Sequence, residues 1–107
     1  MTGITTHILD TTSGRPASGV PVSLEREREG GWQAVGQGTT DTDGRVRTLL
    51  TTAPEAGTYR ITFNTGAYFP TGFFPSVVIT FNVAEGEEHY HVPLLLSPYG
   101  YSTYRGS

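Results

Sequence analysis

Several residue types are missing from this chain of 107 residues, and each absence excludes a class of function. Cysteine is absent, so thiol catalysis, thiolate metal sites and disulfide bonds are excluded. All seven basic residues are arginines, which excludes Schiff-base chemistry on a lysine and a phosphate-binding P-loop. The formal net charge of −3 gives no basic footprint for nucleic acid.

Targeting signals are also missing from the sequence. The first residues carry no basic segment followed by an apolar run, so they do not resemble a secretory signal peptide. No apolar stretch approaches the roughly 18 residues that a membrane-spanning helix needs. We therefore expect a cytoplasmic protein without membrane or nucleic-acid partners. The length suits one domain over residues 1–107, which can bury a core without the help of a disulfide or metal.

Short strands dominate what is present. Fourteen glycines and seven prolines punctuate segments rich in threonine, valine, tyrosine and phenylalanine. About eight strands follow one another at intervals of roughly 8–12 residues, which predicts an all-β sandwich or barrel. No segment keeps a helical period over three turns, so we expect at most one short helix, in the aromatic segment 66–75.

Alternation of apolar and polar residues predicts which side of each strand faces the core. The segments with such an inward face are 4–9, 20–24, 45–50, 59–63 and 77–83. In segment 45–50 the expected inward residues are Val46, Thr48 and Leu50. Residues 10–19 are expected to form a loop, because threonine, serine, glycine and proline fill them.

The C-terminal stretch, residues 89–107, is unusually rich in hydrogen-bonding groups. It predicts a strand, a turn at Ser97-Pro98 and a final strand that continues to residue 107. His89 and His91 are two residues apart on the first of these strands, so they point to the same face. The alternate residues are apolar and are expected to pack in the core, which leaves the histidine face for a channel.

The three histidines have three interpretations. The His89-x-His91 pair and His7 could form a zinc site with an open coordination position. They could equally be hydrogen-bonded surface or interface residues. The third interpretation is general acid–base catalysis, because imidazoles titrate close to neutral pH.

A predicted turn places charged residues before the strand at residue 45. Arg45 is either an ordinary charged residue at a strand start or a planar donor fork for an anionic or amide-rich substrate. Asp41 and Asp43 are interpreted as turn formers rather than as paired catalytic carboxylates, since aspartate caps such turns through its side chain.

Three separated motifs resemble one family. Thr-His-Ile-Leu-Asp at residues 6–10, with Gly-Arg-Pro-Ala at 14–17, is similar to its N-terminal signature. Thr-Asp-Gly-Arg at 42–45 is similar to its central signature. Residues 89–98 and the final Tyr-Arg-Gly-Ser at 104–107 are similar to its C-terminal one. The family is the 5-hydroxyisourate hydrolases, the transthyretin-like enzymes of urate breakdown. The final four residues are the most specific part, because they separate the enzymes from transthyretin, the hormone-binding relative.

The resemblance implies a transthyretin-like sandwich of two four-stranded sheets. It also implies a homotetramer, built as a dimer of dimers, with active sites in the channel between the dimers. The implied reaction hydrolyses 5-hydroxyisourate to 2-oxo-4-hydroxy-4-carboxy-5-ureidoimidazoline, with no metal or other cofactor. The implied catalytic residues are His7, Arg45, His91 and Ser107. The implied substrate-binding residues are His7, Arg45, Tyr104 and Ser107. His89 lies outside both sets.

Residue types fit the roles that the resemblance implies. His7 is the expected general base for water, and His91 positions that water or shares its proton. Arg45 would bind the ring oxygens and stabilise developing negative charge. Ser107 would orient the water or a histidine, through its hydroxyl or a terminal carboxylate. Two other classes stay open: a transthyretin-type binding protein that carries a small apolar ligand without catalysis, and a monomeric accessory sandwich domain.

Overall fold

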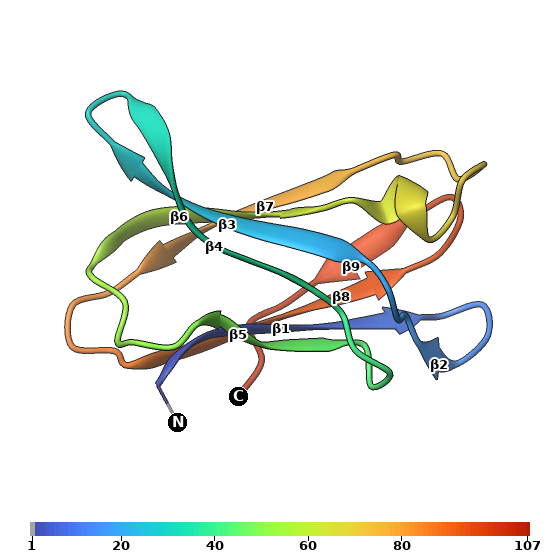
Figure 1. Ribbon diagram of the computed structural model, residues 1–107, viewed down its shortest axis with the longest axis horizontal. Helices are drawn as coiled ribbons and strands as arrows, with labels where there is room; N and C mark the ends of the chain where they lie inside the picture. Colours follow the sequence, from blue (N-terminus) through green and yellow to red (C-terminus); the bar gives the residue numbers. More distant parts are fainter. Residues whose placement is uncertain (1) are drawn as a thin grey trace.

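Two β-sheets packed face to face make up the structure, a computed structural model that describes residues 2–107 (Figure 1). The first sheet contains β1 (Gly3–Asp10), β2 (Arg15–Pro16), β5 (Arg45–Leu50), β8 (His89–Leu96) and β9 (Tyr101–Thr103). The second contains β3 (Pro21–Arg28), β4 (Gly31–Thr39), β6 (Gly57–Phe63) and β7 (Val77–Val83). A single turn of 3-10 helix, η1 (Thr65–Ala67), lies between β6 and β7. The predicted all-β sandwich with at most one short helix is confirmed.

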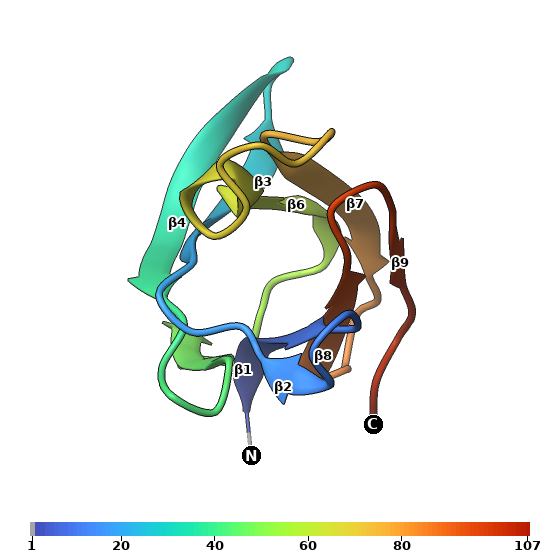
Figure 2. The same ribbon diagram turned by 90° about the vertical axis from the view of Figure 1, so that its right-hand side faces the viewer.

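Strand β1 holds the central position in the first sheet. On one side it pairs in parallel with β8, and β8 in turn pairs with β9. On the other side it pairs antiparallel with β2 at one end and with β5 at the other. The second sheet runs in the order β4-β3-β6-β7, with antiparallel pairing throughout. The parallel pairing of β1 with β8 therefore brings the first strand of the chain beside one that is distant in the sequence (Figure 2).

The hydrophobic core lies between the sheets, on the faces that alternation predicts. Side chains from both sheets reach 0% exposure, and burying each of these aliphatic or aromatic groups stabilises the fold by about 1.5–3 kcal/mol. They include Ile4, Ile8, Leu24, Ile61, Phe63 and Leu94. Because strand residues alternate between faces, the other face of β1 and β8 is free to carry the histidines.

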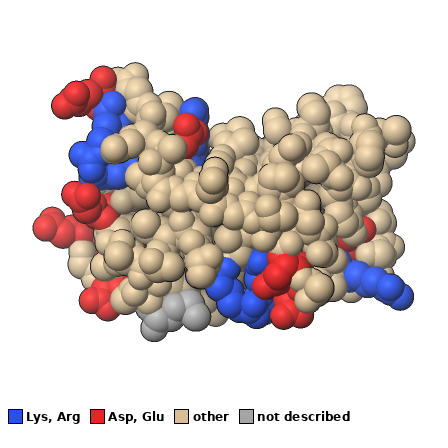
Figure 3. Space-filling view, in the orientation of Figure 1, with Lys and Arg blue, Asp and Glu red and all other residues tan. Residues whose placement is uncertain are grey.

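The hairpin of β3 and β4 extends beyond one end of the sandwich (Figure 1). At the base of this hairpin, the Glu25 carboxylate pairs with Arg60 of the neighbouring β6 at 2.6 Å, and the Arg60 guanidinium lies 4.2 Å from the centre of the Trp32 ring. Figure 3 shows charged side chains gathered at this end and along the lower edge, with a broad uncharged face between them. Within residues 2–107, no helix has the length and apolar character needed to cross a membrane.

Strand β5 departs from the predicted alternation. Thr48 is exposed, and Leu49 is buried with 2% exposure, although Thr48 was the expected inward residue. The cause is an irregularity in the pairing with β1: Val46 lies opposite Thr6 and Leu50 opposite Ile4, so three residues of β5 oppose one of β1. The side chains between these two pairs therefore leave the alternation, and Leu50 returns to the face of Ile4.

Two further expectations differ from the structure. The segment 10–19 was predicted as a loop, but it contains β2, whose Pro16 lies opposite Leu9. This short strand makes the first sheet five-stranded where four strands were expected. The final strand is also shorter than predicted, because β9 ends at Thr103 and the chain pairs again only at Gly106, opposite His91.

Candidate active site

Three neighbouring strands bring together the first candidate residues. His7 of β1 lies directly opposite Arg45 of β5. His91 of β8 lies opposite Thr5 of β1, and Thr5 shares a strand face with His7. The ring centres of His7 and His91 are 6.5 Å apart, and the rings are inclined by only 26°. The two imidazoles and the guanidinium therefore belong to one face of the first sheet, the face that points away from the core.

A tight turn sets the position of Arg45. One carboxylate oxygen of Asp41 accepts hydrogen bonds from the backbone N–H of Asp43 at 2.8 Å and of Arg45 at 3.0 Å. Gly44 adopts a positive φ of 74°, which glycine tolerates without strain. Its carbonyl accepts the N–H of Ile8 at 2.8 Å, which fastens the turn to β1. These contacts agree with the interpretation of Asp41 as a turn former.

The two arginines of β5 differ in their electrostatic partners. Arg47 pairs with Asp41 at 2.9 Å and with Asp43 at 3.5 Å. No carboxylate of residues 2–107 lies within 4.0 Å of the Arg45 guanidinium nitrogens. Arg45 therefore keeps its donor fork and its charge for a bound molecule, whereas the charge of Arg47 is compensated by the turn.

The end of the chain closes one side of the histidine face. The N–H of Gly106 donates to the carbonyl of His91 at 2.8 Å, which places Ser107 beside β8. A cavity of about 140 Å³ results, and it is open to solvent. Its lining residues are Thr5, Thr6, Arg45, Arg47, His89, His91 and Ser107. Of the predicted set, Arg45, His91 and Ser107 line this cavity directly, and His7 adjoins it through Arg45 and His91.

Tyr104 lies apart from the other candidates. Its side chain is exposed and lines a different cavity, of about 280 Å³. This cavity lies between β7 and the C-terminal tail, by which we mean residues 104–107. The apolar residues there include Ile79, Phe81 and Val92, and Arg105 stacks on the Tyr90 ring at 4.5 Å. Within one chain, the structure does not bring Tyr104 into the cavity of the histidines.

Burial and positive charge favour neutral imidazoles at the site. Burial, followed by the neighbouring Arg45 charge, lowers the pKa of His7, while a hydrogen bond with the Asp43 backbone acts in the opposite direction. For His91, burial again lowers the pKa most, and Arg45, His7 and His89 lower it further. Both rings are therefore neutral at pH 7, which is the state in which an imidazole can accept a proton.

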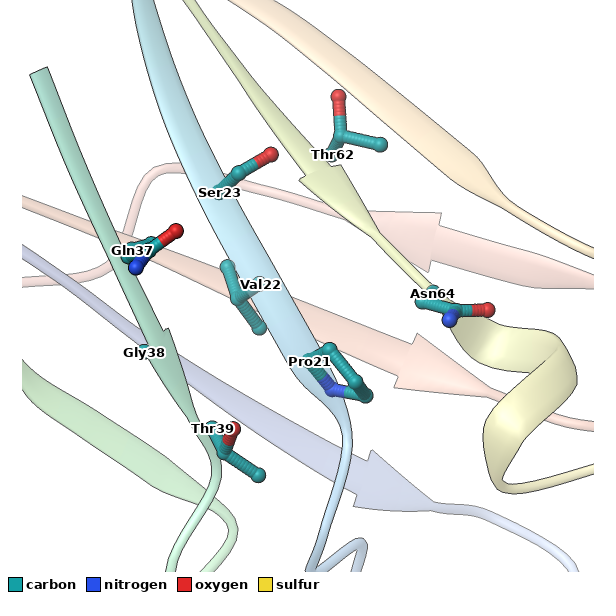
Figure 4. Close-up of a pocket in the computed structure, with 8 residues that line it drawn as sticks. All are labelled: Pro21, Val22, Ser23, Gln37, Gly38, Thr39, Thr62 and Asn64. Carbon is teal, nitrogen blue, oxygen red and sulfur yellow. The ribbon is translucent and has the colours of Figure 1, made fainter. Parts of the chain in front are cut away.

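A roomier cavity lies on the opposite sheet. It measures about 380 Å³ and opens on the outer face of β3, β4 and β6 (Figure 4). Its lining residues are Pro21, Val22, Ser23, Gln37, Gly38, Thr39, Thr62 and Asn64. None of these side chains titrates near neutral pH, so this cavity lacks a general acid or base and is not the candidate active site.

Metal binding was one interpretation of the histidines. Among the residues that the structure describes, no three His, Asp or Glu side chains are grouped closely enough to hold a metal ion. The atom that lies between His89 and His91 is the hydroxyl oxygen of Thr5. Sequence reasoning did not single out Thr5, although alternation placed it on the same face as His7.

The sandwich with paired histidines and an arginine on one outer sheet face defines a transthyretin-like protein with a polar site. The chain belongs to the HIUase/Transthyretin family, which matches residues 4–106. A 5-hydroxyisourate hydrolase of Salmonella typhimurium is 49% identical over 97% of this chain and 80% of its own length.

Solved structures lead to the same family. Klebsiella pneumoniae 5-hydroxyisourate hydrolase superposes with a TM-score of 0.85 at 39% identity, covering 97% of this chain and 98% of its own. Sea bream transthyretin in complex with thyroxine superposes with a TM-score of 0.89 at 34% identity, covering 96% and 93%. The fold is thus common to enzymes and to a binding protein, and the site residues must distinguish them.

Proposed function

We propose that this protein is a hydrolase of 5-hydroxyisourate in urate breakdown, with its active site on the histidine face of the first sheet. The observation that carries the proposal is the cluster of His7, His91 and Arg45 on three adjacent strands. The enzymes among the relatives support it, because the 5-hydroxyisourate hydrolase of Salmonella typhimurium is 49% identical to this chain.

The reaction adds water across an acyl–nitrogen bond of the substrate's six-membered ring. The oxygen of water forms a bond to the ring carbonyl carbon, and the carbon–nitrogen bond breaks. One proton of the water goes to a neutral imidazole and then to the departing nitrogen, so that the histidine is regenerated. The product, 2-oxo-4-hydroxy-4-carboxy-5-ureidoimidazoline, carries the new carboxyl group. No covalent enzyme intermediate is needed.

Each candidate residue has a role that suits its surroundings. His7 is the proposed general base, and His91 orients the water or shares its proton, since lowered pKa values keep both rings neutral. Arg45 binds the ring oxygens and stabilises the negative charge that develops on the attacked carbonyl. Ser107 holds the water or an imidazole in orientation, and its place in the cavity beside His91 supports this role.

A carrier of an apolar ligand is the second candidate function, favoured by the likeness to sea bream transthyretin. The lining of the histidine cavity argues against it. Two arginines, two histidines and three hydroxyl residues surround only about 140 Å³. An apolar ligand would desolvate the Arg45 guanidinium, which has no carboxylate partner among residues 2–107, without giving it a hydrogen-bond acceptor, and this costs free energy.

We also propose that the chain assembles as a homotetramer, a dimer of dimers, with the histidine faces lining a channel between the dimers. Exposed apolar side chains on the β7 and C-terminal regions support burial against other copies: Phe73, Val78, Tyr99, Tyr101 and Tyr104. Tyr104 would then reach a substrate only in the assembly, since within one chain it lies in a separate cavity.

The assembly is tested by size-exclusion chromatography with light scattering. We expect a species of about four times the 11.6 kDa chain mass at micromolar concentration. A species of one chain mass would contradict the tetramer and revive the accessory-domain interpretation, but it would not by itself exclude hydrolysis.

Activity is tested by generating 5-hydroxyisourate from urate and following its decay spectroscopically with and without the protein. The single variants His7→Ala, Arg45→Ala and His91→Ala should each lose about 10²–10⁴-fold in rate, the usual contribution of acid–base and charge-stabilising groups. Arg28→Ala is the matched control, because Arg28 is an arginine exposed on the distant hairpin. If the wild type did not accelerate decay, the proposed function would be wrong; if all three variants kept the wild-type rate, the site would be wrong.

A further inference from the structure

The hydroxyl of Thr5 lies between two histidine rings on the same sheet face. Its oxygen is 2.7 Å from Nδ1 of His91 and 3.4 Å from Nε2 of His89. Thr5 itself is buried, with 5% exposure, and the pairing of β1 with β8 fixes it directly opposite His91. The short contact with His91 is a strong hydrogen bond, whereas the contact with His89 is long and weaker.

A hydroxyl has one hydrogen, so its two contacts are coupled. If the Thr5 hydroxyl donates to His91, Nδ1 carries no proton and Nε2 must carry the ring proton. If the hydroxyl hydrogen points to Nε2 of His89, the Thr5 oxygen accepts from an N–H at Nδ1 of His91. The two arrangements give the two tautomers of His91, and only the second leaves Nε2 with a free electron pair.

The position of His89 makes the second arrangement available. Nε2 of His89 lies 3.4 Å from the Thr5 hydroxyl oxygen, so a neutral His89 with its proton on Nδ1 can accept the hydroxyl hydrogen. The Thr5 oxygen then keeps its electron pairs for an N–H at Nδ1 of His91, 2.7 Å away. In the first arrangement the hydroxyl hydrogen is used by His91, and His89 receives none.

We propose that Thr5 is a positioning residue that keeps the ring proton of His91 on Nδ1, so that Nε2 is an acceptor for the hydrogen of the attacking water. The Cδ2 atom next to Nε2 faces the tail, only 2.7 Å from where a Cβ on Gly106 would lie. Thr5 therefore holds one edge of the ring while the glycine of the tail borders the other. The catalytic consequence rests on the proposed hydrolysis, but the tautomer does not.

The tautomer can be measured without substrate on full-length protein labelled with ¹⁵N in its histidines. Nitrogen chemical shifts and long-range proton–nitrogen couplings distinguish the two tautomers of each ring. In the wild type at neutral pH we expect the proton of His91 on Nδ1. A proton on Nε2 of wild-type His91 would overturn the proposal, whatever the variants do.

Two variants separate the hydroxyl from the shape of the side chain. Thr5→Val keeps the branched shape and removes the hydroxyl, and it should shift His91 towards the Nε2–H tautomer. Hydrolysis should then fall by about 10- to 100-fold, the usual effect of removing a group that orients a functional histidine. Thr5→Ser keeps the hydroxyl and should restore both the tautomer and most of the rate, which a merely structural role would not predict.

The outcomes distinguish failure of this inference from failure of the proposed function. If wild-type His91 carries its proton on Nδ1, Thr5→Val shifts it, and no hydrolysis is seen in any variant, the positioning role stands and the proposed reaction fails. If hydrolysis is strong in the wild type and Thr5→Val changes neither the tautomer nor the rate, the positioning role fails and the reaction stands. Should Thr5→Val not fold, the wild-type tautomer and the Thr5→Ser variant still decide.

Discussion

At the scale of single residues, the proposed site holds two imidazoles with lowered pKa values beside a permanent positive charge. His7 lies opposite Arg45 in the sheet, and Arg45 lowers the pKa of His91 as well. Burial, which acts more strongly than Arg45 on both rings, works in the same direction. The arginine proposed to bind the substrate thus also helps to keep the proposed bases neutral.

The pH dependence of hydrolysis follows from these lowered pKa values. An ordinary histidine gains its proton as the pH falls through about 6.5. Because the pKa values of His7 and His91 are below that value, each ring becomes half protonated only at a pH below 6.5. We expect kcat/KM to fall as the solution is acidified, with a midpoint below pH 6.5. A decline with a midpoint above pH 6.5 would contradict this assignment.

The contribution of Arg45 to both pKa values can be isolated without an activity assay. In the variant Arg45→Gln, loss of the charge should raise the pKa of His7 and of His91 towards 6.5, as followed by NMR titration of the rings. Arg60→Gln is a suitable control, because Arg60 pairs with Glu25 on the second sheet and should leave both titrations in place. Unchanged titrations in Arg45→Gln would show that burial alone lowers the pKa values.

At the scale of elements, the tail and β8 meet where no side chain fits. A Cβ on Gly106 would lie 2.7 Å from Cδ2 of His91 and 3.2 Å from Cγ of Pro93. Contacts this short require the imidazole or the tail to move. Gly106→Ala should therefore reduce hydrolysis by on the order of 10²-fold, the scale expected for a catalytic group displaced by about 1 Å.

Gly100→Ala is the matched control for that substitution. Gly100 is in the same C-terminal hairpin, but a Cβ at this position would lie 3.7 Å from its nearest neighbour, Oγ of Ser97, which is an ordinary contact distance. We expect wild-type turnover in Gly100→Ala and little change in thermal unfolding in either variant, measured by circular dichroism. Full activity in Gly106→Ala would mean that the tail does not determine the position of His91.

The sequence predicted most of these elements because alternation directly reports burial in a two-sided sheet. It assigned Val92 and Leu94 to the core and His91 to the opposite face, as the structure has them. The bulge in β5 had no such signal, because both Thr48 and Leu49 can occupy a strand and pairing with β1 decides between them. The prediction that His7, Arg45 and His91 belong to one site came from the family resemblance. Spacing along one strand cannot predict which strands are neighbours.

The Thr5 hydroxyl was missed for a related reason. A threonine on a strand is ordinarily explained by strand propensity, so nothing in its identity indicates a hydrogen bond to a residue 86 positions away. Only the parallel register of β1 and β8 places it against His91. Tyr104 is the opposite case. The family motif at the end of the sequence predicts that Tyr104 binds substrate, but within one chain its side chain lies outside the cavity of the histidines.

At the scale of the whole molecule, the Asp10 carboxylate joins the two sheets. It accepts hydrogen bonds from the Thr12 side chain at 2.6 Å and from the Tyr68 hydroxyl at 2.8 Å. Asp10 ends β1, and Tyr68 follows η1 in the connection between two strands of the other sheet. Burial alone would raise the pKa of Asp10, but the hydrogen bonds from Thr12, Tyr68 and Ser13 outweigh it and lower the pKa to about 2.

Acid should therefore weaken the fold in a defined range. Because the pKa of Asp10 is lower in the folded than in the unfolded state, its stabilisation is fully present above about pH 4 and is lost as the pH falls towards 2. The contribution amounts to about 2 kcal/mol. Asp10→Asn should lower the free energy of unfolding by about this amount at pH 7, measured with urea, and should flatten its dependence on pH in that acidic range.

The control is an acidic residue on the surface. Glu85 lies in an exposed turn, so the variant Glu85→Gln should change the free energy of unfolding by less than about 0.5 kcal/mol. Tyr68→Phe should lose about 1 kcal/mol, because it removes one of the hydrogen bonds to Asp10. Equal stability of Asp10→Asn and wild type at pH 7 would contradict the role of this carboxylate.

The parallel pairing of β1 with β8 also orders events during synthesis. All four strands of the second sheet lie within residues 21–83, so that sheet can form while β8 is still inside the ribosome. Strand β1 has emerged long before but must wait for a partner across most of the chain, and closing so long a loop is slow. The face that carries His7 and His91 is consequently completed late, and the core between the two sheets closes only when β8 joins β1.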